Sequence, residues 1–400
     1  MKIFFLTSAC LSSLLISGSI NAAIDDNALS VTLNKSCTIN SINQHNCFTS
    51  YNSLKNWISS TRKPNESTPL QINIGPGTFE GTPSPDINLF CNPAEGFTGH
   101  ITFNGAGSKQ SILKGTGSPS ASSINIKDCT HLNFSNLKIE TNFYGGIYWS
   151  GGGQSKWIDV EVDTMARAWA EPSCGTERGQ HYWYSSKISS TAIFSIALPY
   201  SASCDETWFF GSEIQVTVPE SQTGNNGGGA VVATDQGIIH VYGSNLRSFL
   251  NGGSNASFNR VPAASASNGG EVHIHGTGID VISETGQDVV ALDASNGGFI
   301  HAEASAYVMK TSGNKTRINN NGGTIKAVYQ WSQNNQPPSV TSVTGADLAV
   351  ETSCDPSGCH EIDTGTETHL LILNNSCDFA GHGPWFDVVT GKCRGDMSVN

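Results

Sequence analysis

Three carboxylates alternate with aliphatic residues in the segment WIDVEVD, residues 157–163. If Ile158, Val160 and Val162 face a core, the acids between them all point to one side of an extended strand. These acids are Asp159, Glu161 and Asp163. Carboxylates roughly 6–7 Å apart along a strand repel one another, which raises pKa values or recruits a cation such as Ca²⁺. The segment therefore predicts an acid–base site or a Ca²⁺ site, with a solvated acidic face as the alternative.

Aromatic residues are concentrated in the middle of the chain. Five of the eight tryptophans lie between positions 149 and 208, and five of the nine tyrosines lie between 144 and 200. A narrow β-rich interior takes mainly aliphatic side chains, so some of these rings are expected outside, where Trp and Tyr bind sugars at little entropic cost. The candidate substrate-binding residues are Trp149, Trp157, Trp183, Tyr148 and Tyr184. We therefore expect a carbohydrate groove over residues 144–208; packing beneath a long loop is the alternative.

An internal repeat indicates the elements that position these residues. Four segments share a glycine-containing corner followed by alternating apolar residues: TDQGIIHVYGS, SNGGEVHIHGTG, SNGGFIHAEAS and NNGGTIKAVYQ. Their equivalent positions are 33, 28 and 25 residues apart, at Ile239, Val272, Ile300 and Ile325. Repeats of this length, with strand-like alternation and with Gly and Asn at tight corners, predict an all-β parallel β-helix in which each coil stacks on the last.

The same alignment places three histidines at one position of successive repeats. These are His240, His273 and His301, and Lys326 follows in the fourth repeat. All should point outward, and coils about 4.8 Å apart would bring the imidazoles into stacking contact. Such a column disfavours joint protonation and can bind a transition metal. An ordinary polar ladder on the outer wall is the alternative.

The repeat also suggests how the chain is divided. Alternating apolar segments predict that stacking extends from about residue 70 to 332. Leu54, Trp57 and Ile58 share one face of residues 51–63 and predict a short helix that caps the N-terminal end, within residues 24–69. Residues 333–400 carry four cysteines and predict a small disulfide-rich C-terminal module.

The N-terminus and the cysteines predict a secreted protein. Residues 1–23 combine Lys2, an apolar run and the small-residue segment SINAA, as a secretory signal does. Without Cys10, ten of the eleven cysteines remain, and disulfides are expected in an exported chain. Candidate local pairs are Cys37–Cys47, Cys354–Cys359 and Cys377–Cys393, and a zinc site at 354–361 is the alternative for the second pair.

The charge balance limits the class of partner. The formal net charge is −12, which argues against a nucleic-acid partner. It also argues against a polyanionic substrate unless a cation or a local basic patch offsets the repulsion. Beyond the signal, no stretch of sequence is long and apolar enough to predict a membrane span.

Several segments carry a resemblance to a known family. The predicted helix, INIGPGTFEG, ITFNGAGSKQSILKG and INIKDCTHLNFSNLKIET together resemble the opening of pectin-lyase-like β-helix proteins. Within that superfamily they look most like the pectinesterases. The resemblance covers roughly residues 50–250 and implies a right-handed parallel β-helix.

Pectinesterases use an acid aspartate, a nucleophilic aspartate and an arginine. VDTM (162–165) is similar to the segment that carries the acid, which implies that role for Asp163, and LRSF (246–249) implies Arg247 as the arginine. The nucleophile's segment corresponds to SSTAIFSIA (189–197), which contains no carboxylate. Either another carboxylate, such as Asp205 or Glu206, replaces the missing nucleophile, or the chain is not a working pectinesterase.

These features predict a secreted carbohydrate-active protein that acts on or binds a polysaccharide, in the manner of a pectinesterase or a polysaccharide lyase. The alternative is a non-catalytic glycan-binding or adhesin-like surface protein. No cofactor is expected apart from the candidate Ca²⁺, and neither a nucleic acid nor, after signal removal, a membrane is expected as a partner.

Overall fold

The structure of the protein is a computed structural model. The structure describes residues 28–37, 46–80, 87–115, 122–141, 145–165, 167–170, 178–191, 199–219, 228–251, 261–303, 305–328 and 331–332, and the backbone of six short strands between Ser342 and Arg394. The predicted signal at residues 1–23 and the predicted pairs Cys354–Cys359 and Cys377–Cys393 lie outside the residues or side chains described.

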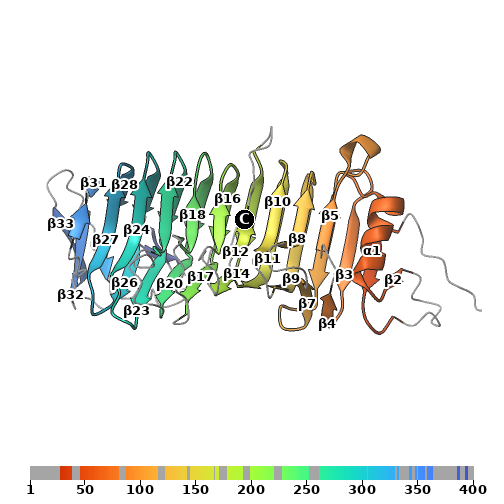
Figure 1. The fold of residues 1–400 in the computed structure, drawn as a ribbon, viewed down its shortest axis with the longest axis horizontal. Helices are drawn as coiled ribbons and strands as arrows, with labels where there is room; N and C mark the ends of the chain where they lie inside the picture. Colours follow the sequence, from red (N-terminus) through yellow and green to blue (C-terminus); the bar gives the residue numbers. More distant parts are fainter. Residues whose placement is uncertain are drawn as a thin grey trace, which may run out of the picture.

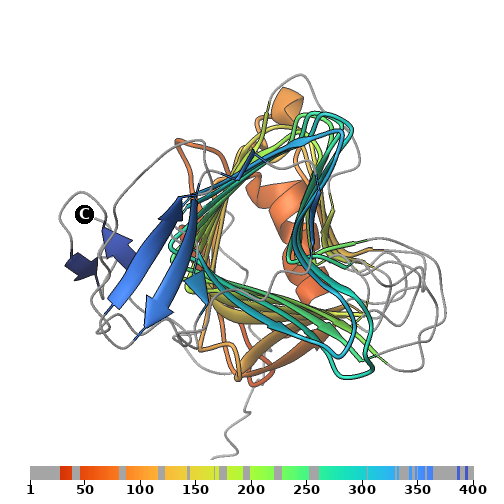
Figure 2. The ribbon, with the colours of Figure 1, turned by 90° about the vertical axis from the view of Figure 1, so that its left-hand side faces the viewer.

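The chain winds through three strand-lined faces, and successive coils stack into an elongated body (Figure 1). Seen along the long axis, the strands of successive coils superpose on three sides of a triangle (Figure 2). Within these faces the neighbouring strands are parallel. The architecture is thus all-β and built from large parallel sheets, which is compatible with the predicted β-helix.

The first face carries the candidate site described below. Its strands are β1 (Ser30–Leu33), β3 (Leu70–Ile74), β6 (Ile101–Gly105), the first half of β9 (His131–Thr141), the first half of β11 (Gln154–Thr164), β13 (Gln180–Tyr184), β16 (Glu206–Phe210), β19 (Ile238–Tyr242), β22 (Glu271–His275), β25 (Phe299–Glu303), β28 (Thr324–Val328) and β31 (Asp347–Leu348). Parallel pairing therefore begins at β1, inside the segment assigned to the N-terminal cap.

The second face follows each first-face strand around one corner. It contains β4 (Gly77–Glu80), β7 (Ser111–Gly115), the second halves of β9 and β11, β14 (Lys187–Thr191), β17 (Glu213–Val218), β20 (Asn245–Leu250), β23 (Gly278–Ser283), β26 (Ala306–Lys310) and β29 (Trp331–Ser332).

The third face returns the chain to the start of the next coil. It contains β5 (Ile87–Phe90), β8 (Ser122–Lys127), β10 (Gly145–Ser150) and β12 (Arg167–Ala170), then β15 (Tyr200–Ala202), β18 (Val231–Ala233), β21 (Ala264–Ser267), β24 (Val289–Ser295), β27 (Lys315–Asn321) and β30 (Ser342–Thr344). Two antiparallel hairpins follow, β32 (Val350–Asp355) with β33 (Gly358–Asp363) and β34 (Trp385–Asp387) with β35 (Lys392–Arg394).

The register confirms the sequence repeat. Ile239 pairs with Val272, Val272 with Ile300, and Ile300 with Ile325, all buried. Because strand side chains alternate, this register also fixes which residues of each repeat point outward.

Left-handed residues form the corner between the first and second faces. One residue per coil has a φ between 46° and 57° in the column Asn136, Asp159, Ser185, Gly211, Gly243 and Gly276. In three of these coils the next residue is a serine that points inward: Ser186, Ser212 and Ser244. The hydroxyl of each serine donates to the backbone carbonyl two residues earlier. The hydroxyl of Ser212 also accepts the backbone N–H of Ser186 in the preceding coil, and the hydroxyl of Ser244 accepts that of Ser212. This ladder satisfies backbone groups that the corner would leave unpaired.

The Asn-Gly-Gly segments form another corner, at the end of the third face. In SNGGEV, Asn268 and Gly269 have φ values of 52° and 82°. Gly270 follows, and a Cβ there would lie 2.4 Å from the backbone carbon of Ala233 in the preceding coil. The motif thus combines two left-handed residues with one position that has no room for a side chain.

The ends of the body differ. The predicted helix begins at Ser50, whose hydroxyl accepts the N–H of Ser53, and runs as α1 (Tyr51–Trp57) into a π-helical turn at Ile58–Arg62. Leu54, Trp57 and Ile58 are buried, as the pattern predicted. The helix lies at one end of the stack, near β2 (Cys47–Phe48) (Figure 1). The rest of the described helical structure is a 3₁₀ turn at Pro93–Glu95.

Disulfides join several parts of the described chain. The predicted pair Cys37–Cys47 is present, and Cys91 is bonded to Cys129 across 38 residues, a pairing that the sequence did not indicate. Cys204 is also disulfide-bonded. No described helix has the length and apolar character of a membrane span.

Candidate functional site

An outward column of stacked rings crosses the middle of the first face. Tyr182, Trp208, His240 and His273 pair in register on successive strands β13, β16, β19 and β22. Their ring centroids are 4.7, 5.3 and 5.0 Å apart, and neighbouring planes are tilted by at most 16°. Each residue is half-buried, so the column forms part of the surface.

A second column runs beside the first. Tyr184, Phe210, Tyr242 and His275 stack with centroid separations of 5.1, 5.4 and 5.0 Å. Ile158 precedes Tyr184 in register and is 43% exposed, which adds an apolar side chain to this surface. The five outward aromatic residues on β13, β16 and β19 are called the aromatic face: Tyr182, Tyr184, Trp208, Phe210 and Tyr242.

The spacing of the rings fixes their orientation. Two aromatic rings with centroids about 5 Å apart cannot lie side by side in one plane, so they stand on the sheet with their faces against one another. The surface therefore presents ring edges, together with the Tyr hydroxyls and the indole edge of Trp208. Burial raises the pKa of the Tyr182 and Tyr184 hydroxyls, which remain protonated donors at neutral pH.

Charged residues border the aromatic face. Glu206 Oε1 lies 3.0 Å from His240 Nε2, beside Trp208. Burial lowers the pKa of His240, and its hydrogen bond with Glu206 opposes this shift. The ammonium of Lys156 lies 5.7 Å from the centroid of Tyr184, where it covers the end of the second column.

The tryptophans proposed as sugar-binding residues are not on this surface. Trp149, Trp157 and Trp183 are at most 1% exposed, so their expected contact with a sugar is wrong for this structure. The interior is wide enough here to hold a stack of Phe103, Phe134, Trp157 and Trp183, with centroid separations of 4.8, 4.1 and 4.6 Å. Large flat rings fill the interior by stacking in register, as aliphatic side chains do in later coils.

The two proposed tyrosines lie on different faces. Tyr184 points outward in the aromatic face. Tyr148 is half-buried on β10 of the third face, in register with Asn125 and Ala170. The sequence analysis did not predict the outward positions of Tyr182, Trp208, Phe210 and Tyr242. Extending the repeat upstream through QHYWYSS and ETWFFGS nevertheless aligns three of them with the histidine columns.

The acidic segment 157–163 does not form one row of carboxylates. Asp159 is a corner residue with a φ of 52°, and the alternation changes phase there. Ile158 therefore points outward instead of into the core, whereas Trp157, Val160 and Val162 point inward. Only Glu161 and Asp163 project from the same side of one strand, on the second face.

The side chain of Lys138 neutralises these two carboxylates. Lys138 Nζ lies 3.5 Å from Glu161 Oε1 and 3.5 Å from Asp163 Oδ2, and Glu140 is a third partner at 3.4 Å. Burial alone would lower the pKa of Lys138, but these carboxylates raise it overall. Among the described side chains, no group of three or more His, Cys, Asp or Glu residues is arranged to hold a metal ion.

The resemblance-based catalytic pair is separated along the stack. Asp163, Ser189, Gln215 and Arg247 occupy one outward row of the second face, so Asp163 and Arg247 are three strand spacings apart, about 14 Å. Arg247 lies between Glu213 and Asp280, at 3.5 and 3.2 Å. Ser189 occupies the place next to Asp163 and donates to its Oδ1 at 3.2 Å. The pair expected to cooperate in ester hydrolysis is not assembled.

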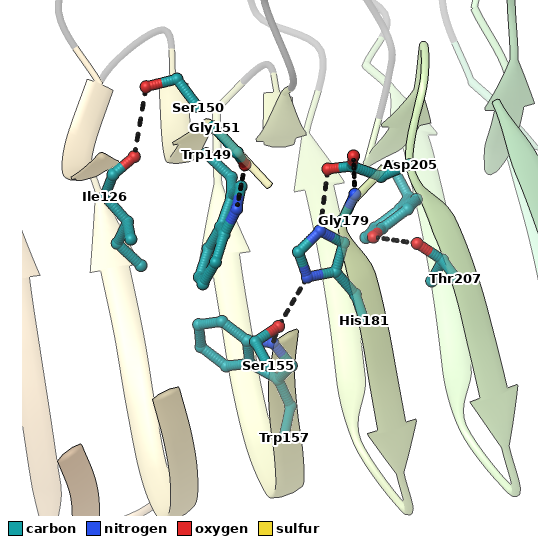
Figure 3. Close-up of polar contacts among 11 residues, drawn as sticks. Ile126, Trp149, Ser150, Gly151, Ser155, Trp157, Gly179, His181, Asp205 and Thr207 are labelled. Atoms are coloured by element: carbon teal, nitrogen blue, oxygen red, sulfur yellow. Dashed lines mark hydrogen bonds and ion pairs between the residues drawn. The ribbon is translucent and has the colours of Figure 1, made fainter. Parts of the chain in front are cut away.

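A second polar cluster lies inside the coils. Figure 3 shows Ser155, His181 and Asp205 in a continuous hydrogen-bonded chain. Ser155 Oγ is 2.7 Å from His181 Nδ1, and His181 Nε2 is 2.9 Å from Asp205 Oδ2. Trp157 Nε1 donates to Ser155 Oγ at 2.7 Å, and the N–H of Gly179 donates to Asp205 Oδ1 at 2.6 Å.

Every donor in this series of hydrogen bonds faces an acceptor when the imidazole of His181 is neutral. Trp157 can only donate, so the Ser155 hydroxyl accepts from it and donates onward to His181 Nδ1, which leaves the proton on Nε2 facing Asp205. Burial lowers the pKa of His181, although Asp205 opposes the shift. His181 is 0% exposed, so this Ser–His–Asp chain has no contact with a substrate in solution. Asp205, one of the two candidate replacement nucleophiles, is likewise buried and has both oxygens hydrogen-bonded.

Comparisons with known proteins add no relative. No protein-family model, no curated protein and no solved structure matches the chain.

Proposed function

We propose that this chain is an exported β-helix protein that binds a polysaccharide on its first face. The single observation that carries the proposal is the aromatic face, two adjacent columns of outward rings over β13, β16 and β19. The finer fold assignment belongs to the same proposal: a right-handed helix of the pectin-lyase type, with α1 as its N-terminal cap. The disulfides are consistent with export.

The shape of the aromatic face suits an extended polymer. Its columns follow the long axis, and each coil repeats the same outward positions at a spacing of about 4.8 Å. The rings are held by their neighbours, so little side-chain entropy remains to be lost when a ligand binds. A sugar chain can place its hydroxyl and ring oxygens against the ring edges, which carry partial positive charge, and pair its hydroxyls with Tyr182, Tyr184, Tyr242 and Glu206.

The arrangement of charged residues on the second face favours polysaccharide binding over ester hydrolysis as the function. A working pectinesterase-like site requires the acid and the arginine close to a nucleophilic carboxylate. Here Asp163 and Arg247 are three strands apart and each is engaged by other charged residues. Glu161 and Asp163 are therefore assigned to stabilisation of the fold.

One observation favours a second candidate function, a carbohydrate-active enzyme. Glu206 and His240 form a half-buried pair at 3.0 Å at the border of the aromatic face. A neutral imidazole oriented by a carboxylate is a suitable general base. Release of methanol, unsaturated ends or reducing ends from a bound polymer would support this candidate, and Glu206→Gln should then abolish the release.

The test of the binding proposal uses Trp208, at the centre of the aromatic face. We expect Trp208→Ala to weaken binding of a polysaccharide by about tenfold, because truncating a central aromatic contact costs about 1.4 kcal/mol. The measurement is affinity electrophoresis in gels that contain members of a panel of neutral and acidic plant and microbial polysaccharides.

Phe249→Ala is the matched control. Phe249 is an outward, half-buried aromatic residue on β20, on the second face instead of the first. Its truncation should leave migration in every gel unchanged. Failure of the parent protein to bind any polysaccharide, or equal binding by the parent and Trp208→Ala, would overturn the proposal.

A further inference from the structure

Four histidines continue the first face beyond the aromatic residues. They are called the imidazole patch: His240, His273, His275 and His301, from β19, β22 and β25. The rings of His240 and His273 stack at 5.0 Å, and the ring of His301 meets those of His275 and His273 edge-on at 5.5 and 6.3 Å. All four are half-buried and project outward, so solvent reaches them.

Charged groups on the strands of the patch and on the two neighbouring strands face its imidazoles. Glu206 contacts His240 at 3.0 Å, Glu271 contacts His273 at 3.1 Å, and Glu303 contacts His275 at 3.3 Å. Lys326 on β28 follows His301 in register and is exposed. With neutral imidazoles, the three carboxylates and one ammonium give the area a net charge of −2, and four imidazolium groups change it to +2.

The geometry does not favour a transition metal. The planes of His240 and His273 are nearly parallel, so their nitrogens lie side by side and do not converge on one point. Nε2 of His240 and Nε2 of His273 already face Glu206 and Glu271. A strip of like groups repeated along the axis instead suits a ligand that carries repeated anionic groups.

We propose that the imidazole patch is an acid-switched binding strip for a polyanionic glycan, one that carries sulfate or carboxylate groups along its chain. The proposal rests on the proposed function in that it takes the first face as the polymer-binding surface. Protonation converts the imidazole patch from a surface that repels the anionic polymer into one that forms ion pairs with it. Lys326 extends the strip at its far end.

The direction of the switch follows from the titrating groups. Burial, together with the neighbouring imidazoles, lowers the pKa of His240 and His301, so both are neutral at neutral pH and gain charge below the ordinary histidine value of about 6.5. The hydrogen bond from His275 lowers the pKa of Glu303, which remains ionised in mildly acidic solution. As the pH falls below about 6.5, each protonated imidazole therefore makes the local charge less negative, and protonation of at least three of the four makes it positive on a chain whose overall charge is −12.

The experiment compares three polymers with one backbone: dextran, dextran sulfate and carboxymethyl-dextran. Binding to the full-length protein is measured by isothermal titration calorimetry at about pH 5 and about pH 7.5, on either side of the ordinary histidine pKa. We expect one or both anionic polymers to bind at least about tenfold more tightly at the lower pH. Unsubstituted dextran should show no such change. The anionic polymer that binds identifies the group that the strip recognises.

Two variants separate the switch from general charge effects. His273→Gln combined with His275→Gln should remove most of the gain at acidic pH, whereas Lys326→Gln should weaken binding at both pH values and keep the pH dependence. His131→Gln, an exposed histidine on the same face outside the patch, is the matched control and should behave as the parent.

Equal affinity of both anionic polymers at the two pH values would overturn the inference, as would full pH dependence in the doubly substituted protein. Neither result affects the test with Trp208→Ala and neutral polysaccharides. Conversely, loss of all neutral-polymer binding with a retained acid switch would remove the aromatic-face proposal alone.

Discussion

His181 is an ionisable side chain with no exposed surface, and its hydrogen bonds account for its position. Ser155 and Asp205 bind its two ring nitrogens, and the rings of Trp149 and Trp169 surround it at 4.9 and 4.7 Å. A buried imidazole without such partners would cost about 1–3 kcal/mol for each unsatisfied group. The Ser–His–Asp hydrogen bonds therefore allow these polar residues to be buried in the interior. The three residue types are those of a catalytic triad, but His181 is not accessible to a substrate.

His181 should make folding stability depend on pH. Its pKa is lower in the folded chain than in the unfolded chain, because burial penalises the imidazolium. As the pH falls below about 6.5, the unfolded chain takes up a proton that the folded chain does not, so the free energy of unfolding decreases until the folded pKa is reached. Calorimetry of His181→Phe should show a lower Tm at neutral pH, because Ser155 and Asp205 lose a partner, but a shallower decrease between about pH 7 and pH 5 than in the parent. The surface variant His131→Gln should keep the parent's dependence; an equally steep decrease in His181→Phe would contradict the assignment.

At the scale of the elements, the corner residues determine how closely successive coils approach one another. The Asn-Gly-Gly corner brings successive coils so close that the second glycine has no room for a Cβ. At Gly298 a Cβ would lie 2.2 Å from the carbonyl oxygen of Ala266, whereas at Gly297 nothing lies within 4 Å. The two neighbouring glycines therefore serve different purposes, because Gly297 is required for its φ of 77° and Gly298 for the coil contact.

This pair of glycines gives a direct comparison within one turn. Gly297→Ala should reduce the free energy of unfolding by about 1–2 kcal/mol, the cost of a left-handed alanine. Gly298→Ala should reduce it by more, roughly 3 kcal/mol, because the backbone of the neighbouring coil must shift. Urea denaturation followed by circular dichroism measures both. Equal losses, or a smaller loss in Gly298→Ala, would show that the coils do not approach as closely as described.

At the scale of the whole molecule, the first and second faces have different surfaces. The second face carries alternating charges that neutralise one another, such as Lys187 with Glu213 and Lys138 with Glu161. The first face carries the aromatic face and the imidazole patch in one line along the axis. Because every coil adds one residue to each column, a stack of coils converts a local repeat into a linear surface.

The stack also predicts a shape that can be measured in solution. Twelve first-face strands from β1 to β31 are joined by successive parallel pairings, which at about 4.8 Å per spacing gives a length of about 50 Å. Small-angle X-ray scattering should therefore give the asymmetric pair-distance distribution of an elongated particle. A symmetric distribution would contradict the stacking.

The sequence by itself determined the repeat and its register. The offsets from Ile239 to Ile325, the shared outward position of His240, His273 and His301, and the buried face of the helix at Leu54, Trp57 and Ile58 were all predicted and are all present. These features depend on side-chain alternation and corner residues, which are local properties of the chain.

The tertiary structure alone decided what lies inside each coil. The left-handed corner at Asp159 reverses the phase of the alternation, so Ile158 is outside and Trp157 is inside. Whether a tryptophan fits the interior depends on the rings above and below it, which belong to coils about 25 residues away in sequence. The separation of Asp163 from Arg247 likewise depends on how many coils the intervening chain forms. Stacking between coils is non-local, and for that reason the position of the candidate site required the folded molecule.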